Sequence, residues 1–280
     1  MSRPLRVCSF ESRRADEMQS LIERNHAVAT VVESLREIPL GMTPQLEEFL
    51  SCLRSGAADV VIFMTGVGAE SLVTAMESKC SREEFFRLLQ QASIVVRGPK
   101  PWATLRKWGV RIDARADEPN TWREVVQAVL AVTPSRTDLT GRRICVQEYG
   151  LPSSELYAEL AGRGAEVVAV PVYRWALPED TLPLEQVIRD TVSGVFDLIL
   201  LTTGQQLVHT LQVADLHGLR AAWLAAVRRC VVASIGPTTS QQLVRAGLPV
   251  DFEPAQPHMG QLVRGALAAA PGLLPDCRIR

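Results

Sequence analysis

The chain has 280 residues, 47% of them hydrophobic and 22% charged, and its formal net charge is −1. This length suits two domains of ordinary size, each able to bury its own core. The near-neutral charge and an aromatic content of 5% argue against a nucleic-acid partner or an acidic membrane surface. An anionic ligand therefore needs basic residues that are gathered locally.

Short apolar runs alternate with amphipathic helical patterns along the whole chain. Helices are expected at 15–25 and 69–76, for example, and Gly109 and Gly247 are each expected to end a helix in the left-handed conformation. Unbroken Val/Ile/Leu runs suit parallel strands that are covered on both faces, so we predict doubly wound α/β layers. The predicted strands are 7–10, 28–32, 60–63, 94–96, 144–147, 167–170, 198–201 and 231–235.

One part of the chain occurs twice. The segment 59–66 recurs 138 residues later as 197–204, and Arg6-Val7-Cys8 has a counterpart in Arg143-Ile144-Cys145 after a small insertion. Each copy is too long for a solenoid repeat and long enough for a domain. We therefore predict an internal duplication into two related α/β units. The 138-residue offset also relates Gly98-Pro99 to Gly236-Pro237, Leu105 to Leu243, Gly109 to Gly247 and Asp113 to Asp251.

The cysteines and histidines show no metal-ligand spacing. We expect the cysteines to be buried free thiols of a reducing cytosol, and the histidines to be surface or core residues. Ser153-Ser154 fit a helix N-cap better than a nucleophile. Neither a signal-peptide pattern nor a membrane-spanning stretch is recognisable, so we expect a cytoplasmic protein without metal or membrane contact. The residues concerned are Cys8, Cys52, Cys80, Cys145, Cys230 and Cys277, and His26, His209, His217 and His258.

Two strand-to-helix turns are candidates for anion binding. Thr65-Gly66-Val67-Gly68 resembles the start of a dinucleotide fingerprint, but Ser71 stands at the third glycine position and no suitable acidic residue follows. We favour backbone N–H groups that bind an anion at the helix N-terminus, with Thr202-Thr203-Gly204-Gln205 offering the same in the other copy. A purely steric need for glycine in these turns is the open alternative.

Another repeated pair follows the next strand of each copy. Arg97-Gly98-Pro99-Lys100 precedes a helix expected from Trp102, and Gly236-Pro237-Thr238-Thr239 precedes one expected from Ser240. Arg13 and Arg14, after the first strand, share this carboxyl-end position, where α/β sheets bind ligands. The alternative for these basic residues is an ordinary solvated charge.

Tyr173 is one of three tyrosines and lies in a connector after a strand. A phenol can donate a hydrogen bond to a leaving oxygen and is uncharged at neutral pH. The alternative is an amphipathic residue that fills an interface.

Together these motifs resemble the uroporphyrinogen-III synthase family from Val7 to Leu267. The resemblance rests on the duplicated turns, on Gly-Pro-Thr-Thr at 236–239, on Pro-Val-Tyr-Arg at 171–174 and on Gln147-Glu148-Tyr149-Gly150. It implies two α/β lobes joined by a two-stranded β-ladder. The expected lobe 1 is 1–38 plus 177–280, lobe 2 is 44–172, and the linkers are about 39–43 and 173–176.

The resemblance also implies a reaction without a cofactor. Hydroxymethylbilane loses water, ring D is inverted through a spiro intermediate, and uroporphyrinogen III forms. Tyr173 matches the tyrosine proposed to assist loss of the hydroxyl. We expect a monomer that takes its substrate by handover from hydroxymethylbilane synthase. The expected substrate-binding residues are Arg13, Arg14, Thr65, Gly66, Val67, Gly68, Arg97, Lys100, Tyr149, Thr203, Gly204, Gln205, Thr238 and Thr239.

The chain departs from the family pattern in places. Many members carry Thr-Ser where Thr65-Gly66 and Thr203-Gly204 stand, and Pro101 replaces a common threonine. Two other functions stay open: a non-catalytic tetrapyrrole-binding regulator and a two-lobed binding protein for a smaller anion. The lack of a recognisable DNA-binding segment after Leu267 and of an export signal favours the enzyme over both.

Overall fold

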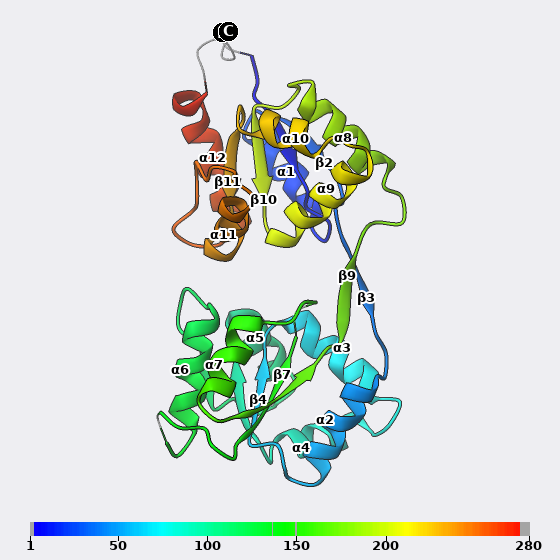
Figure 1. The fold of residues 1–280 in the computed structure, drawn as a ribbon, viewed down its shortest axis with the longest axis vertical. Coiled ribbons are helices and arrows are strands. Elements are labelled where there is room, and N and C mark those ends of the chain that lie inside the picture. Colours follow the sequence, from blue (N-terminus) through cyan, green and yellow to red (C-terminus); the bar gives the residue numbers. More distant parts are fainter. Residues whose placement is uncertain (1–2, 136, 149, 275–280) are drawn as a thin grey trace. The chain divides into compact units, whose positions relative to one another are not determined.

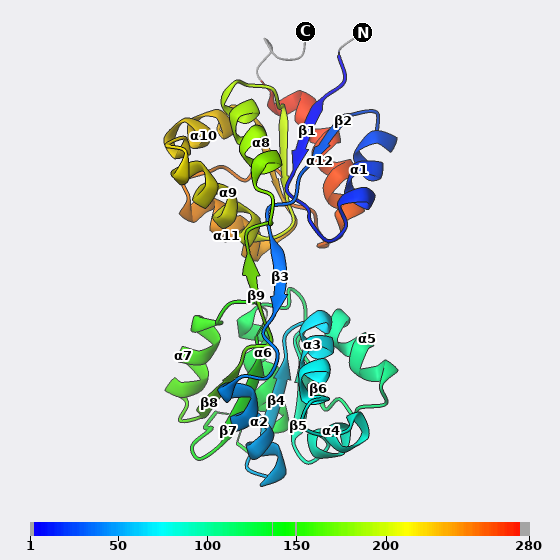
Figure 2. The same ribbon diagram turned by 90° about the vertical axis from the view of Figure 1, so that its right-hand side faces the viewer.

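The computed structural model describes residues 3–135, 137–148 and 150–274. The chain divides into two compact units, unit 1 with Met1–Arg36 and Ala176–Arg280 and unit 2 with Glu37–Trp175. The strands β3 (Arg36–Pro39) and β9 (Tyr173–Ala176) pair as a two-stranded antiparallel ladder, and both views show them side by side (Figures 1 and 2). The predicted fold, two parallel-sheet units with a β-ladder, is confirmed. Whether each unit folds by itself, as a domain does, stays a prediction.

Unit 1 contains a four-stranded parallel sheet in the order β11-β10-β1-β2. The helices α8 to α11 pack on one face, and α1 and α12 pack on the other (Figure 2). The strands are β1 (Arg6–Ser9), β2 (Val28–Val31), β10 (Leu198–Leu201) and β11 (Val231–Ser234). The helices are α1 (Ala15–Arg24), α8 (Leu182–Val192), α9 (Gly204–Leu216), α10 (Arg220–Val227), α11 (Pro237–Arg245) and α12 (Met259–Leu273).

Unit 2 contains a five-stranded parallel sheet in the order β6-β5-β4-β7-β8. The helices α2 to α5 cover one face, and α6 and α7 cover the other (Figure 1). The strands are β4 (Val60–Phe63), β5 (Ser93–Val96), β6 (Ala114–Arg115), β7 (Arg143–Gln147) and β8 (Glu166–Val170). The helices are α2 (Pro44–Arg54), α3 (Gly66–Met76), α4 (Arg82–Leu89), α5 (Pro99–Lys107), α6 (Trp122–Val132) and α7 (Ser154–Gly162).

The central strand of unit 2 shows why the unbroken apolar runs become buried strands. All four residues of β4 are buried. Val61 and Phe63 pack against the helices on one face, while Val60 and Ile62 pack against α6 and α7 on the other. Successive side chains of a strand point to opposite faces, so a strand covered on both sides needs an apolar residue at every position.

The duplication extends to individual hydrogen bonds. The carboxylate of Asp59, just before β4, accepts the N–H of Arg143 at 2.8 Å. The carboxylate of Asp197, just before β10, accepts the N–H of Arg6 at the same distance of 2.8 Å. In both units this bond ties the beginning of the central strand to its neighbour. The two aspartates thus perform the same task in the two copies.

Three predicted helix starts were wrong by three residues. The helix α3 begins at Gly66 instead of Ala69, and α5 and α11 begin at Pro99 and Pro237. The sequence prediction placed the prolines before the helices. Proline is favoured at the first helical position, because the N–H that it lacks has no intrahelical partner there.

Other local predictions had mixed outcomes. Gly109 and Gly247 follow α5 and α11 with φ of +70° and +71°, so the predicted left-handed helix ends are confirmed. Ser153 stands at the N-cap of α7, so the predicted N-cap position is confirmed, although its side chain makes no capping hydrogen bond.

The described cysteines are free thiols, and four of them are buried: Cys8, Cys52, Cys145 and Cys230. Cys80 is partly exposed, and Cys277 lies outside the described residues. Within the described residues, none of the helices has the length and hydropathy needed to cross a membrane.

Candidate functional site

Each sheet has one position where the chain order of its strands reverses. In unit 2 this is between β4 and β7, and in unit 1 it is between β10 and β1. Open α/β sheets bind ligands at the carboxyl ends of the strands beside such a point. We call the residues there the unit-2 edge (65–68, 97–100, 147–148, 150 and 173) and the unit-1 edge (11–14, 202–206 and 236–239). The predicted site residues among the described ones fall on these two edges.

The N-terminus of α3 lies at the unit-2 edge and has two backbone N–H groups that are not used in capping the helix. Thr65 is the N-cap, and its Oγ1 accepts the N–H of Gly68 at 3.0 Å. Its own N–H donates to Oε1 of Gln147 at 3.3 Å. Within the described part of the chain, the N–H groups of Gly66 and Val67 have no acceptor. These two donors, at the positive end of a helix, are suited to a carboxylate.

The two glycines of this turn are also required by close packing. A Cβ at Gly66 would lie 2.7 Å from Oγ1 of Thr104 and 3.2 Å from the carbonyl oxygen of Lys100. A Cβ at Gly68 would overlap the side-chain amide of Gln147, which is fully buried. The steric explanation therefore holds for both glycines, alongside the N–H donors.

We expect serine to be tolerated unequally at the two equivalent glycines. Gly66→Ser places its Cβ against the backbone of α5 and should lower the free energy of unfolding by about 1–3 kcal/mol. At Gly204 the nearest atom is Cγ of Gln242, at 2.6 Å, on a partly exposed side chain that can move. Gly204→Ser should therefore cost less than about 1 kcal/mol. Urea unfolding of both variants measures the difference, and equal losses would contradict the packing argument.

The α5 and α11 N-termini offer fewer donors than the sequence suggested. Pro99 and Pro101 have no N–H, so among the first three residues of α5 only Lys100 has one. In α11, Thr239 donates its N–H to the carbonyl of Gly236 at 3.0 Å. Thr238 is exposed whereas Thr239 is buried, so these two predicted residues do not share an environment.

The helix α9 uses most of its N-terminal donors internally. Thr203 caps it by accepting the N–H of Gln205 at 3.4 Å. Oε1 of Gln206 accepts the N–H of Thr202 at 2.8 Å, and its Nε2 donates to Oγ1 of Thr202 at 2.8 Å. Gln205 and Gln206 are both buried. The sequence prediction missed Gln206, although Thr203-x-x-Gln206 is a capping-box pattern.

Arg13 and Arg14 lie exposed beside a hollow of about 380 Å³ at the start of α1. The hollow is also lined by Asp16, Glu17 and Glu33, so carboxylates outnumber the arginines there. Nε of Arg14 donates to Oε2 of Glu17 at 2.7 Å. An exposed pair of this kind contributes only about 0.2–1 kcal/mol, so a ligand carboxylate can replace it at small cost.

Tyr173 lies in the core of unit 2 and is only 3% exposed. Its ring lies against the backbone of Gly150, where a Cβ would be 2.9 Å from Cε2 of Tyr173 and 2.9 Å from Cε2 of Trp175. Arg97 follows β5 at the same edge and is partly buried. The predicted binding residue Tyr149 lies outside the described residues.

The prediction for the histidines is confirmed at His209, on α9. It is 4% exposed, and its Nδ1 lies 2.9 Å from the carbonyl oxygen of Ser34, which can only accept, so Nδ1 carries the proton. Burial lowers the pKa of His209, against the opposing effect of this hydrogen bond. Among the described residues, no group of three or more histidine, cysteine or carboxylate side chains could hold a metal ion.

The lowered pKa of His209 predicts a loss of stability in mild acid. Below its ordinary value of 6.5 the unfolded chain takes up a proton that the folded chain does not, so the free energy of unfolding falls with pH. The slope from one such group is at most about 1.4 kcal/mol per pH unit. Urea unfolding between about pH 7.5 and 5.5 should be less pH-dependent in His209→Gln. The exposed His26 provides the control, and His26→Asn should leave the slope unchanged.

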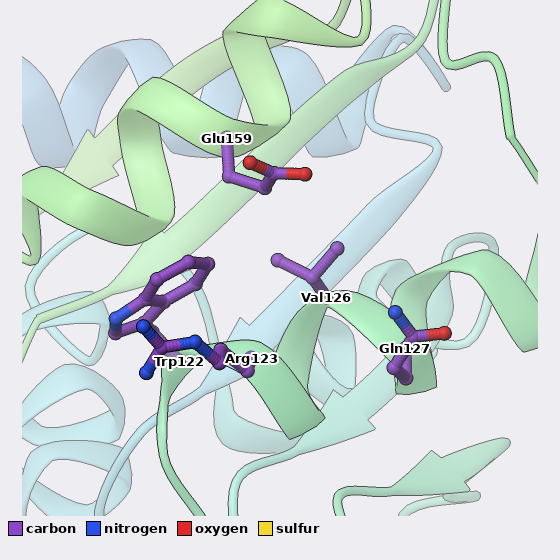
Figure 3. A pocket seen from close by; sticks show the side chains of 5 residues that line it. All are labelled: Trp122, Arg123, Val126, Gln127 and Glu159. Carbon is purple, nitrogen blue, oxygen red and sulfur yellow. The ribbon is translucent and has the colours of Figure 1, made fainter.

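A second hollow lies between α6 and α7 (Figure 3). It has a volume of about 230 Å³ and is lined by Trp122, Arg123, Val126, Gln127 and Glu159. The guanidinium of Arg123 lies 4.5 Å from the centre of the Trp122 ring. The hollow contains no residue that the sequence motifs singled out.

The fold and the two edges define a class of protein. It is a duplicated α/β protein whose two parallel sheets each place helix N-termini at a topological switch point. A family model described as Uroporphyrinogen-III synthase HemD matches residues 16–264. The chain belongs to the uroporphyrinogen-III synthase family.

Two relatives match the chain at modest identity, and the name of the second agrees with this assignment. The chain is 27% identical over 259 residues to YjjA of Bacillus subtilis, an uncharacterised protein, covering 92% of this chain and 93% of that one. It is 27% identical over 235 residues to a putative uroporphyrinogen-III synthase of Methanothermobacter thermautotrophicus, covering 84% and 87%.

Solved structures with the same fold include two uroporphyrinogen-III synthases. A mutant of the Thermus thermophilus protein has a TM-score of 0.68 and 21% identity, covering 96% of this chain and 99% of that one. The Helicobacter pylori protein has a TM-score of 0.57 and 14% identity, covering 94% and 99%. At these identities the likeness establishes the fold.

Proposed function

We propose that the protein is a uroporphyrinogen-III synthase, a lyase of tetrapyrrole biosynthesis. It removes water from hydroxymethylbilane, inverts ring D and closes the ring to uroporphyrinogen III. The observation that carries the proposal is the family match over residues 16–264, which includes all of the unit-2 edge and the segments 202–206 and 236–239 of the unit-1 edge. The name of the Methanothermobacter relative, a putative uroporphyrinogen-III synthase, agrees with it.

The unit-2 edge supports binding of the carboxylates of this substrate. The N–H groups of Gly66 and Val67 are available at a helix N-terminus, while Arg97 and Lys100 add positive charge at the neighbouring strand. In the unit-1 edge we assign carboxylate binding to Gly204, through its N–H, and to the exposed Thr238 and Arg13. Thr65 and Gln205 then shape their turns and do not bind substrate directly.

Tyr173 is our candidate for assisting departure of the hydroxyl group. Its position against Gly150, beside the carboxyl end of β7, supports this role, because a phenol can donate a proton to a leaving oxygen. Tyr173→Phe keeps the packing of the ring and removes only the hydroxyl. We expect kcat to fall about tenfold with KM nearly unchanged. Steady-state kinetics check this, and an unchanged kcat would remove Tyr173 from the mechanism.

The remaining parts of the proposal concern the protein's setting. We propose a cytoplasmic monomer that needs no cofactor and receives its substrate from hydroxymethylbilane synthase. The buried free thiols of Cys8, Cys145 and Cys230 support a reducing compartment.

A rate measurement tests the function. Purified protein is added to freshly prepared hydroxymethylbilane, and substrate consumption is compared with the spontaneous rate. We expect an acceleration that increases linearly with protein concentration. Tight binding of tetrapyrrole without acceleration would instead identify the non-catalytic regulator.

A further inference from the structure

Glu148 is a buried carboxylate at the unit-2 edge that the proposed mechanism does not yet use. It follows β7 directly and is 8% exposed. The side chain of Gln147 accepts the N–H of Thr65 and donates to the carbonyl oxygen of Glu148. Glu148 is thereby tied to the turn whose N–H groups we assign to substrate carboxylates.

Among the described residues, no lysine or arginine forms an ion pair with Glu148, so no cation there balances its charge. The hydroxyl of Tyr157, on α7, donates to its Oε1 at 2.6 Å, a length typical of an O–H bond to a carboxylate. Burying a carboxylate without a cation is costly, and one beside an anion site also repels the ligand. A glutamine at this position could accept the same hydrogen bond from Tyr157 without the desolvation of a charge and without repulsion of an anionic ligand. The fold alone therefore does not explain why a charged residue stands here.

The other copy of the repeat supplies a comparison. Glu11 follows β1 at the position equivalent to Glu148, 137 residues earlier. Both of its oxygens are used in the fold, since Oε1 accepts the N–H of Arg14 at 3.2 Å and Oε2 accepts the hydroxyl of Thr202. The residue equivalent to Tyr157 is Ser20, an exposed side chain on α1. In unit 1 both oxygens of Glu11 are thus bonded within the fold, whereas in unit 2 one oxygen of Glu148 has no protein donor among the described residues.

We propose that Glu148 is a catalytic residue, the base that accepts the pyrrole N–H proton when hydroxymethylbilane loses water; the proposal rests on the function proposed above. The C–O bond of the hydroxymethyl group breaks, its electron pair leaves on oxygen, and a proton from Tyr173 completes the water. The electrons of the pyrrole N–H bond enter the new double-bond system as Glu148 takes the proton. When the substituted α-carbon of ring D attacks to form the spiro intermediate, the nitrogen recovers its proton from Glu148. After the rearrangement, the free α-carbon of ring D closes the macrocycle and gives its proton to Tyr173.

The geometry explains why this base is a buried carboxylate. Positive charge develops on the pyrrole as the hydroxyl leaves, and the negative charge of the buried Glu148 side chain stabilises it. The Tyr157 hydroxyl holds one oxygen and leaves the other to the substrate. Tyr157 is therefore a positioning residue in this account.

The test compares Glu148→Gln with Glu11→Gln in steady-state assays on hydroxymethylbilane. We expect Glu148→Gln to lose about 100-fold in kcat with KM changed by less than about threefold. Glu148→Asp, which keeps the charge, should recover at least about tenfold of that loss. Glu11→Gln should keep kcat within about threefold, because Glu11 acts in the fold alone.

The outcomes distinguish a failure of the proposed function from a failure of the role of Glu148. Wild-type protein without any acceleration contradicts the proposed function and, with it, this inference. An active wild type with Glu148→Gln within about fivefold of its kcat overturns the inference alone, as do equal losses in Glu148→Gln and Glu11→Gln. If Glu148→Gln does not fold, Glu148→Asp and Tyr157→Phe provide the test. We expect both variants to have a lower kcat at unchanged KM. A wild-type kcat in both would refute the role of Glu148 as the base.

Discussion

Replacing Asp197 with alanine is expected to lower the free energy of unfolding of unit 1 by about 3 kcal/mol. The Asp197 carboxylate is completely buried, and it accepts two hydrogen bonds from the Arg3 guanidinium, at 2.6 and 2.7 Å, and one from the N–H of Arg6 at 2.8 Å. Burial by itself raises the pKa of Asp197, but the bonds from Arg3 and Arg6 outweigh it and lower the pKa. The charged form is therefore the one that stabilises the fold.

The duplicated Asp59 is the matched control for this prediction. It has the same position before the central strand of unit 2, but its side chain is 29% exposed and its partner Arg142 is 40% exposed. Asp59→Ala should cost only about 1 kcal/mol, because water can replace the lost contacts. Hydrogen–deuterium exchange of peptides from β10 and β4 measures each unit separately. A loss of protection in Asp59→Ala as large as in Asp197→Ala would show that burial is not the deciding factor.

Replacing Gly150 with alanine is expected to damage both stability and turnover. Gly150 has a φ of +90°, which a residue with a Cβ adopts only under strain, and its Cβ would lie 2.9 Å from the rings of Tyr173 and Trp175. Backbone strain and overpacking together should cost about 2–4 kcal/mol. Because the Tyr173 ring has to move, we also expect kcat to fall at least about tenfold.

Gly141 is the control that separates backbone strain from overpacking. It also has a positive φ, of +75°, but a Cβ there would meet nothing within 4 Å. Gly141→Ala should therefore cost about 1 kcal/mol from strain alone and leave kcat unchanged. Urea unfolding and steady-state kinetics on both variants give the two quantities. Equal effects in the two variants would rule out a specific contact between Gly150 and Tyr173.

The two parallel sheets could be predicted from the sequence, because each buried strand is an unbroken apolar run in the chain. The unbroken apolar runs at 60–63 and 198–201 are the central strands β4 and β10, and the offset of 138 residues relates them. The β-ladder of β3 and β9 is different, since local patterns there indicated only connectors. It was expected from the family resemblance alone.

The site was less predictable, because its details depend on contacts between distant residues. The hydroxyl of Thr202 bonds to Glu11, and the N–H of Thr65 to Gln147, across 191 and 82 residues of chain. No local pattern shows that both carboxylate oxygens of Glu11 accept hydrogen bonds within the fold, from Arg14 and Thr202. The turn at 65–68 could be found from its strand-turn-helix pattern, but which of its N–H groups stay available could not.

The structure also changes the meaning of the duplication. The two edges start from the same sequence motifs, yet the α9 turn satisfies most of its donors internally through Thr203 and Gln206, while the α3 turn leaves those of Gly66 and Val67 without an acceptor among the described residues. We therefore expect binding residues in both units and the proton-transferring groups in unit 2.

The central claim, that this protein makes uroporphyrinogen III, is tested most directly by the isomer that it forms. Porphobilinogen and hydroxymethylbilane synthase supply the substrate, the protein is added, and the oxidised uroporphyrins are separated by chromatography. We expect the type III isomer to predominate with the protein and the type I isomer without it. Type I product alone in the presence of folded protein would contradict the account.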